Sequence, residues 1–229
     1  LIMKIEKFIS SFVEQSIKKK NLCNLILSGG KPPIDLYKLI SKLKLNFEKI
    51  NLTILDERIV KKKSKYLNYN LIKKIFKNKK VSIYDLLMEF KNNSTNKIIK
   101  KYNKSSPLLI TGIGKDGHFA SIFYNSRMYN KLINLKERKK FIQVEKIGKP
   151  FVPRITMNLS LILCSKKILI ILNSKLEKKI FYKAINDNLK YRLPINVLIH
   201  HAKNKLMIYD GKVLMKYNDF IKKNIKTFQ

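Results

Sequence analysis

The sequence predicts an α/β fold in which a mainly parallel sheet is covered by helices on both faces, with a small additional lobe. Apolar runs of strand length alternate with amphipathic stretches of helix length along the 229 residues. Five of the seven glycines fall in two clusters, Gly29-Gly30 and Gly112 to Gly117. Each cluster lies between a strand-like and a helix-like run, the corner at which open α/β sheets bind ligands. We treat residues 1–229 as a single domain.

The first half of the chain alternates between expected helices and strands. Ile5, Ile9 and Phe12 recur at helical spacing and give the first helix one apolar face. Pro33 suits the first turn of the second helix. Expected helices span residues 3–20, 34–43, 67–76, 81–90 and 95–102, and expected strands span residues 22–27, 52–55 and 108–111.

The second half continues this alternation and completes a ligand-binding edge. We expect a short helix from His118, a strand over 141–144, a loop over 150–154, a further short helix, a strand over 168–172, a helix over 175–188, a short helix at Pro194 and a strand over 206–209. Polar residues 28–31, 56–58 and 112–118 all fall at the carboxyl ends of predicted strands. Ligands of open sheets sit beyond these ends, so the three segments predict a single pocket.

The charge of the chain is extreme but diffuse. Fifty basic residues stand against 15 acidic ones, for a formal net charge of +35. Almost all the basic residues are lysines spread over the whole sequence, and most other abundant residues have A/T-rich codons. Genomic base composition explains this pattern better than a dedicated polyanion site does, so we expect no specific nucleic-acid partner. The charge should still speed the association of phosphorylated substrates.

Cysteine usage and hydropathy favour a cytoplasmic protein. Cys23 and Cys164 both lie in apolar runs and are expected to be free, buried thiols with no metal-ligand spacing around them. The N-terminal stretch lacks the apolar core and cleavage site of a signal peptide. The most apolar region, residues 159–172, is interrupted by Lys166-Lys167 and is too short to cross a bilayer, so we expect no membrane partner.

Four ordered segments of the chain resemble the 6-phosphogluconolactonase family. The family pattern has a Ser-Gly-Gly-Ser-Thr-Pro loop, an Asp-Glu-Arg strand end followed by an Asn, a Gly-x-Gly-x-Asp-Gly-His-x-Ala-Ser-x-Phe segment and a Pro-x-x-Arg-Ile-Thr segment. The corresponding segments here are Ser28-Gly29-Gly30-Lys31-Pro32-Pro33, Asp56-Glu57-Arg58 with Asn68, residues 112–123, and Pro153-Arg154-Ile155-Thr156. The resemblance runs from about residue 8 to residue 211.

This resemblance implies a Rossmann-like fold of the sugar-phosphate isomerase type and a defined reaction. The reaction is hydrolysis of 6-phospho-D-glucono-1,5-lactone to 6-phosphogluconate, the second step of the oxidative pentose phosphate pathway, with no metal or organic cofactor. The implied partner is therefore a small sugar-phosphate lactone, and we expect a monomer or a weak oligomer.

The candidate catalytic residues are His118 and Asp116. A δ-lactone is an activated ester, so hydrolysis needs a positioned base for water, and His titrates near neutral pH. We expect His118 to take the proton from the attacking water. Asp116 would orient the imidazole or bind a sugar hydroxyl, and backbone N–H groups of Gly112–Gly117 would stabilise the oxyanion. His200 and His201 have no partner motif and are interpreted as structural or surface residues.

The candidate substrate- and phosphate-binding residues lie in the other segments. A glycine-rich turn before a helix favours anions, and rare arginines in a lysine-dominated chain suggest a need for forked donors. Asp56 would accept a hydroxyl or hold Arg58, and Glu57 is expected to be structural. The family also uses a lysine at the start of a late helix, for which Lys175 and Lys178 compete. The resulting set is Ser28, Gly29, Gly30, Lys31, Asp56, Arg58, Gly114, Arg154 and Lys178.

The chain departs from the family pattern in the first loop. Lys31-Pro32 replaces the family's Ser-Thr, which removes two hydroxyls and one N–H group. The loss of a hydrogen bond to a charged group costs about 1.5–3 kcal/mol. Phe119 and Tyr124 replace a Thr and a Pro of the third segment. These changes bear on substrate affinity more than on reaction type.

Two other functions remain as alternatives. Glucosamine-6-phosphate deaminases share the fold and the Asp-Gly-His segment, but carry a Glu five residues after the His, where this chain has Phe123. Without that acid the chemistry of ring opening lacks its proton carrier. A polyanion-binding protein on the same fold would explain the charge, but the lysines are diffuse and no nucleic-acid-binding motif is present.

Overall fold

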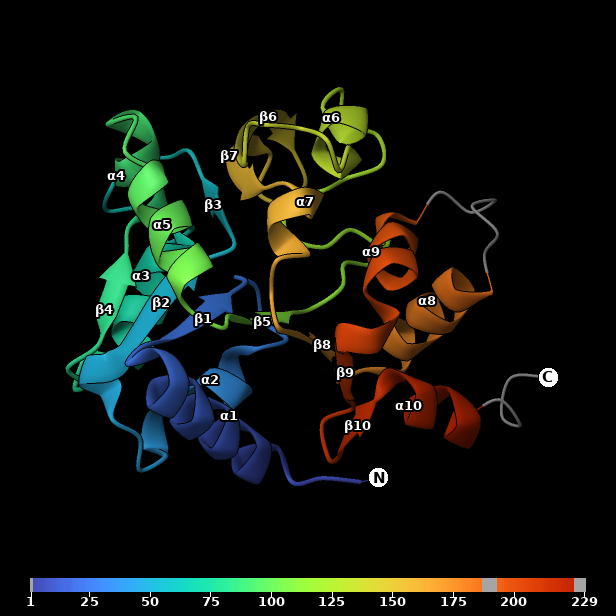
Figure 1. Cartoon of the computed structure of the whole chain (residues 1–229). Coiled ribbons are helices and arrows are strands. Elements are labelled where there is room, and N and C mark those ends of the chain that lie inside the picture. Colours follow the sequence, from blue (N-terminus) through green and yellow to red (C-terminus); the bar gives the residue numbers. More distant parts are fainter. Residues whose placement is uncertain (1, 187–192, 225–229) are drawn as a thin grey trace.

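The core of the protein is a seven-stranded sheet with the order β10-β9-β8-β5-β1-β2-β4. The computed structural model describes residues 2–186 and 193–224 (Figure 1). Neighbouring strands are parallel except β9 and β10, which are antiparallel. The strands are β1 (Cys23–Leu27), β2 (Ile50–Ile54), β4 (Ser82–Tyr84), β5 (Leu108–Thr111), β8 (Lys167–Ile171), β9 (Leu206–Tyr209) and β10 (Leu214–Lys216). The predicted parallel α/β sheet is confirmed.

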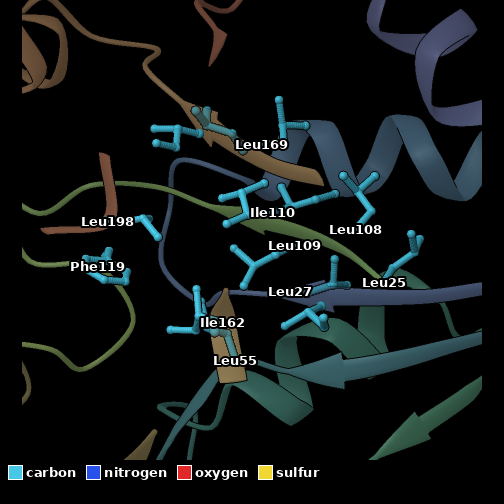
Figure 2. Packing of buried hydrophobic residues seen from close by; sticks show 14 of the residues in the cluster. Leu25, Leu27, Leu55, Leu108, Leu109, Ile110, Phe119, Ile162, Leu169 and Leu198 are labelled. Atoms are coloured by element: carbon cyan, nitrogen blue, oxygen red, sulfur yellow. The ribbon is translucent and has the colours of Figure 1, made fainter. Parts of the chain in front are cut away.

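The central strands are buried along their whole length because helices cover both faces of the sheet. Every residue of β1, β2 and β5 is buried, which explains why these segments are runs of apolar residues and not alternating patterns. Two of the polar exceptions, Asn24 and Thr53, pair across neighbouring strands, where the Thr53 hydroxyl donates to Asn24 Oδ1 at 2.9 Å. Figure 2 shows the packing, with labels on Leu25, Leu27, Leu55, Leu108, Leu109, Ile110, Phe119, Ile162, Leu169 and Leu198.

Helices lie on both sides of this sheet. In Figure 1, α1 and α2 lie below strands β1 and β5, and α5 and α7 lie above them. The helices are α1 (Ile5–Lys20), α2 (Ile34–Lys42), α3 (Asn68–Ile75), α4 (Leu86–Lys91), α5 (Asn96–Lys104), α6 (Tyr129–Ile133), α7 (Leu159–Ile162), α8 (Lys175–Ile185), α9 (Pro194–Ala202) and α10 (Tyr217–Asn224), with 3₁₀ turns at Phe47–Lys49 and Lys203–Lys205. None of the helices in the described part of the chain combines the length and apolar character needed to cross a membrane.

A second, three-stranded antiparallel sheet forms the predicted small lobe. Its order is β3 (Asp56–Arg58), β7 (Val152–Met157) and β6 (Phe141–Ile147). Only Leu55 separates β3 from β2, so the chain passes directly from the main sheet into the lobe. The register places Arg58 opposite Arg154, although the two residues are far apart in the sequence.

Three predicted elements are wrong. Residues 81–90 are not one helix, because Ser82–Tyr84 pairs with β2 as an edge strand and Asp85 then caps α4 by accepting from the Met88 N–H group at 3.0 Å. No helix starts at His118, because Ala120 has a left-handed φ of 52° that a helix cannot contain. The predicted loop over 150–154 contains the start of β7, which pairs on both sides with β3 and β6.

Smaller differences concern the C-terminal region and one cysteine. β10 and α10 were not expected, and α8 ends at Ile185, while residues 187–188 of the predicted helix lie outside the described residues. Cys23 is buried and free as predicted. Cys164 is also free, but the prediction that it is buried is wrong, because it follows the short helix α7 on an exposed turn.

A core substitution in β8 should destabilise the protein strongly. Leu169 is fully buried, so Leu169→Ala should lower the free energy of unfolding by about 2–5 kcal/mol through lost burial and the cavity left behind. Leu176 on α8 is 45% exposed, and Leu176→Ala should cost about 0.5 kcal/mol or less. Urea unfolding of both variants measures the difference, and equal losses would contradict the placement of β8 in the core.

Candidate active site

A cavity of about 600 Å³ opens at the carboxyl ends of β1 and β5, next to β3 and the β6–β7 hairpin. It gathers residues from all four motif segments of the sequence. The lining residues are Ser28, Gly29, Gly30, Pro32, Asp56, Arg58, Thr111, Gly112, Ile113, Gly114, Lys115, Asp116, His118, Phe119, Ala120, Phe123, Gly148, Lys149 and Arg154. Every candidate site residue except Lys31 and Lys178 is therefore on this wall.

His118 and Asp116 form a hydrogen-bonded pair at the cavity wall. The His118 Nδ1 atom bonds Asp116 Oδ1, and the imidazole stacks on the Phe123 ring with centroids 4.1 Å apart. About a quarter of the His118 side chain is exposed, at 28%. Partial burial acts to raise the pKa of Asp116, but its hydrogen bond with His118 and the attraction of that side chain outweigh burial and hold the pKa below its ordinary value. Asp116 is thus an ionised acceptor that fixes the orientation of the ring.

Gly114 makes room for this imidazole. A Cβ atom at Gly114 would lie 2.1 Å from the His118 ring, so no other residue fits without moving the histidine. The Gly114 N–H group donates to the His118 carbonyl at 2.8 Å, and the Gly117 N–H group donates to the Gly114 carbonyl at 3.0 Å. These two N–H groups are occupied inside the turn and do not support the expected oxyanion stabilisation, which for the other N–H groups of residues 112–117 stays a prediction. The two glycines shape the turn instead.

The first glycine-rich loop joins β1 to α2. Ser28 is buried, its N–H group donates to the Ile110 carbonyl at 3.1 Å, and its carbonyl accepts from the Tyr37 hydroxyl at 2.9 Å. The Ser28 Oγ atom is buried and has no hydrogen-bond partner among the described residues. The loop therefore holds one unpaired hydroxyl that is enclosed behind the cavity wall, close to the N-terminus of α2 at Ile34, where anions are favoured.

Asp56 and Arg58 belong to the same strand but have different partners. The buried Asp56 carboxylate accepts from the Ser121 hydroxyl at 2.7 Å. The Arg58 Nη1 atom donates to the Tyr66 carbonyl at 2.9 Å and to Asn68 Oδ1. Asp56 was expected either to accept a substrate hydroxyl or to hold Arg58. No hydrogen bond joins Arg58 to the Asp56 carboxylate among the described residues, so these contacts do not support the second role.

Glu57 between them is structural, as the sequence analysis expected. Its side chain is fully buried and accepts from the backbone N–H groups of Arg58, Asn68 and Tyr69 at 2.7–2.8 Å. It thereby satisfies the first N–H groups of α3 and ties that helix to β3. Burial raises the pKa of Glu57 from 4.5 to about 7, although these N–H donors act to lower it.

Arg154 is buried and holds the β6–β7 hairpin against the site. Its Nε atom donates to the Ile147 carbonyl at 3.0 Å, and its Nη2 atom donates to the Pro150 carbonyl at 3.1 Å. The guanidinium carbon lies 5.5 Å from the centre of the Phe123 ring that also stacks on His118. Burial lowers the pKa of Arg154, while the neighbouring Asp56 acts to raise it. Arg154 therefore combines positive charge in the cavity with a bracing role.

The structure does not bring Lys31 or Lys178 to the cavity wall. Pro32, the neighbour of Lys31, lines the cavity instead, and its carbonyl accepts from Asn173 Nδ2 at 2.9 Å. The Nζ atom of Lys178 lies 3.9 Å from Asp210 Oδ2. The substrate contacts assigned to these two lysines remain predictions that the geometry does not support.

Sequence reasoning missed two other lysines and one aromatic residue of the site. Lys115 lies inside the glycine-rich turn that the sequence analysis singled out, so its position was a usable signal. Lys149 lies in the turn of the β6–β7 hairpin and lines the cavity because this hairpin packs next to it. No local feature of the sequence predicts this position of the hairpin. Phe123 was identified as the end of the third family segment and as a difference from the deaminases, but its stacking on the His118 ring was not expected.

The charges of the cavity wall suit a phosphorylated ligand. Four basic side chains line it, from Arg58, Lys115, Lys149 and Arg154, against two carboxylates. Within residues 2–186 and 193–224, no group of three or more His, Cys, Asp or Glu side chains is arranged to hold a metal ion.

Comparisons with known proteins match nearly the whole chain. The family model described as "Glucosamine-6-phosphate isomerases/6-phosphogluconolactonase" matches residues 1–208. A 6-phosphogluconolactonase from Helicobacter pylori is 28% identical over 214 residues, covering 91% of this chain and 92% of the relative. A 6-phosphogluconolactonase from Neisseria meningitidis is 24% identical, covering 84% and 87%.

Solved structures show the same fold. The crystal structure of a 6-phosphogluconolactonase from Shewanella baltica superposes with a TM-score of 0.77 at 18% identity, covering 89% of this chain and 90% of that one. A 6-phosphogluconolactonase from Plasmodium vivax gives a TM-score of 0.72 at 23% identity, covering 95% and 89%.

The buried carboxylate of Glu57 should make stability depend on pH. Because its pKa rises from 4.5 unfolded to about 7 folded, its stabilising contribution is complete below about pH 4.5 and is lost as the pH rises through about 7. Glu57→Gln does not titrate, so from about pH 4 to about pH 8 the free energy of unfolding should shift in favour of the variant by about 3 kcal/mol relative to wild type. Urea unfolding of both proteins across this range measures the shift, and a constant difference would contradict it.

Proposed function

The chain belongs to the glucosamine-6-phosphate isomerase/6-phosphogluconolactonase family, and we propose that it hydrolyses 6-phospho-D-glucono-1,5-lactone to 6-phosphogluconate. The observation that carries this proposal is the hydrogen-bonded Asp116–His118 pair in the wall of a basic cavity. Relatives that cover most of the chain are named 6-phosphogluconolactonase, which supports the lactonase branch of the family. The enzyme is then a carboxylic ester hydrolase of the oxidative pentose phosphate pathway.

His118 acts as the general base in this proposal. The Asp116 carboxylate accepts a hydrogen bond only from a protonated Nδ1 atom, which leaves the Nε2 lone pair of a neutral imidazole free. Nε2 takes a proton from water while the water oxygen attacks the lactone carbonyl carbon. The bond between that carbon and the ring oxygen then breaks, and the ring oxygen takes the proton back from Nε2. The open-chain acid ionises to the product carboxylate.

The phosphoryl group of the substrate would lie between the first loop and β3. Arg58 supplies charge and directional donors, and Ser28 supplies the unused hydroxyl, beside the glycines of the loop at the N-terminus of α2. Lys115 and Lys149 add positive charge to the same cavity. Their presence offers a physical compensation for the hydroxyls that Lys31-Pro32 removes.

The deaminase alternative is disfavoured by the surroundings of the histidine. The side chain stacked on His118 is Phe123, at the position where the resemblance places the acid of the deaminases. An aromatic ring there supplies packing and orientation but no proton transfer. The lysines are spread along the whole sequence, which disfavours a dedicated polyanion-binding role, and the cytoplasmic location and the monomeric or weakly oligomeric state remain predictions.

Removal of the imidazole should abolish most of the rate acceleration. General-base catalysis contributes about 10²- to 10⁴-fold, so His118→Ala should lower kcat by that factor relative to wild type. The measurement is hydrolysis of freshly generated 6-phosphogluconolactone, with the spontaneous rate subtracted and the salt near physiological to suppress nonspecific binding to this basic protein.

The control is His200→Ala, because His200 is exposed on α9 and outside the cavity wall. A His118→Ala enzyme that kept most of its rate would rule out the base assignment. Wild-type protein without acceleration would overturn the lactonase proposal, and glucosamine-6-phosphate would then be the substrate to test.

A further inference from the structure

Asn68 is a buried residue that touches three parts of the candidate site without lining the cavity. We propose that Asn68 is a positioning residue, which fixes the Arg58 guanidinium and the first glycine-rich loop relative to each other. The inference rests on the proposed function, in which Arg58 binds the phosphoryl group of the substrate. Asn68 is the first residue of α3, and its side chain is 1% exposed.

Both ends of the Asn68 side-chain amide are bonded to β3. The Oδ1 atom accepts from Arg58 Nη1, and the Nδ2 atom donates to the Asp56 carbonyl at 2.6 Å. The Asn68 backbone N–H group donates to the Glu57 carboxylate at 2.8 Å. All three residues of β3 therefore bond Asn68, and the amide cannot rotate without breaking two of these bonds.

Asn68 also contacts the first glycine-rich loop. A Cβ atom added to Gly29 would lie 1.8 Å from Asn68 Oδ1 and 2.2 Å from the amide carbon. The backbone of the loop thus rests directly on the amide plane, and glycine at position 29 is required by this approach. The distance between the loop and Arg58 is set by one side chain that touches both.

These contacts decide which edge of the Arg58 guanidinium is free. The two hydrogens of Nη1 go to the Asn68 amide and to the Tyr66 carbonyl. The Nε atom is buried and has no hydrogen-bond partner among the described residues. Because Nε is enclosed, the Nη2 end, for which no hydrogen bond is present among the described residues, is left for an anionic oxygen of the phosphoryl group.

Only an amide meets these requirements at position 68. A carboxylate could accept from Arg58, but it would place an oxygen against the carbonyl oxygen of Asp56. It would also bury a third carboxyl group beside those of Asp56 and Glu57. A leucine has the same number of side-chain heavy atoms and the same branching at Cγ, but supplies neither the acceptor nor the donor. Asn68→Leu therefore tests the hydrogen bonds while it leaves the packing largely filled.

The test compares Asn68→Ala and Asn68→Leu with Asn70→Ala in lactone hydrolysis. Asn70 lies on the same helix and bonds only the Lys62 and Ser64 carbonyls away from the cavity, so it is a matched control. We expect both Asn68 variants to raise KM by about ten- to a hundred-fold, with kcat within about three-fold of wild type. In an Arg58→Ala background the same substitutions should change KM by less than about two-fold. Gly29→Ala, which pushes the amide from the loop side, should reproduce the rise in KM even if an Asn68 variant fails to fold.

A second readout is independent of catalysis. Calorimetric titration with inorganic phosphate should show weaker binding to the Asn68 variants and unchanged binding to Asn70→Ala. Asn68 variants that match Asn70→Ala in KM and in phosphate binding would overturn the positioning role. A rise in KM that persists undiminished in the Arg58→Ala background would also overturn it. Wild-type protein that binds phosphate but does not accelerate hydrolysis would refute the proposed function and leave the positioning role to be decided by the phosphate titrations.

Discussion

Leu55 is the single residue through which the main sheet continues into the small lobe, and the candidate site depends on this junction. Its N–H group donates to the Leu27 carbonyl at 2.9 Å, at the end of β1, and its carbonyl accepts from the Met157 N–H group at 3.1 Å, at the end of β7. One residue is thus bonded to both sheets. With no loop between β2 and β3, β3 starts next to the carboxyl end of β1, and Asp56 and Arg58 line the cavity there together with the first glycine-rich loop.

The charged groups brought together by this junction are tolerated because nearly all of them are bonded. Asp56 is held by the Ser121 hydroxyl, Glu57 by backbone N–H groups, and Arg154 by carbonyls of its own hairpin. Each of these three buried charged groups therefore has a hydrogen-bond partner, which is the condition under which burial of charge is tolerated. Among the described residues, the buried side-chain atoms without a partner are Asn24 Nδ2 and Asn51 Nδ2 in the main sheet, and Ser28 Oγ and Arg58 Nε, which belong to residues of the cavity wall.

The same network connects the histidine to the lobe. His118, Phe123 and Arg154 form a continuous stack from the glycine-rich turn to the β6–β7 hairpin. The left-handed φ of Ala120 bends the chain between His118 and Phe123, so that the imidazole and the ring lie face to face and not on successive turns of a helix. Backbone conformations of this kind cost free energy and persist where the surrounding structure holds them.

The sequence by itself determined the parallel α/β sheet, the two ligand-binding corners and most of the candidate site. Each depends on local patterns: buried strands are apolar on both faces, and glycines clustered between a strand and a helix indicate a ligand-binding corner. Only the tertiary structure decided the rest. Contacts between residues distant in sequence determine that β3 pairs with β7, that Lys149 lines the cavity and that Lys178 lies near Asp210 and not at the cavity wall. Such contacts leave no periodicity in the chain, because they follow from how the two sheets are joined and not from the spacing of neighbouring residues.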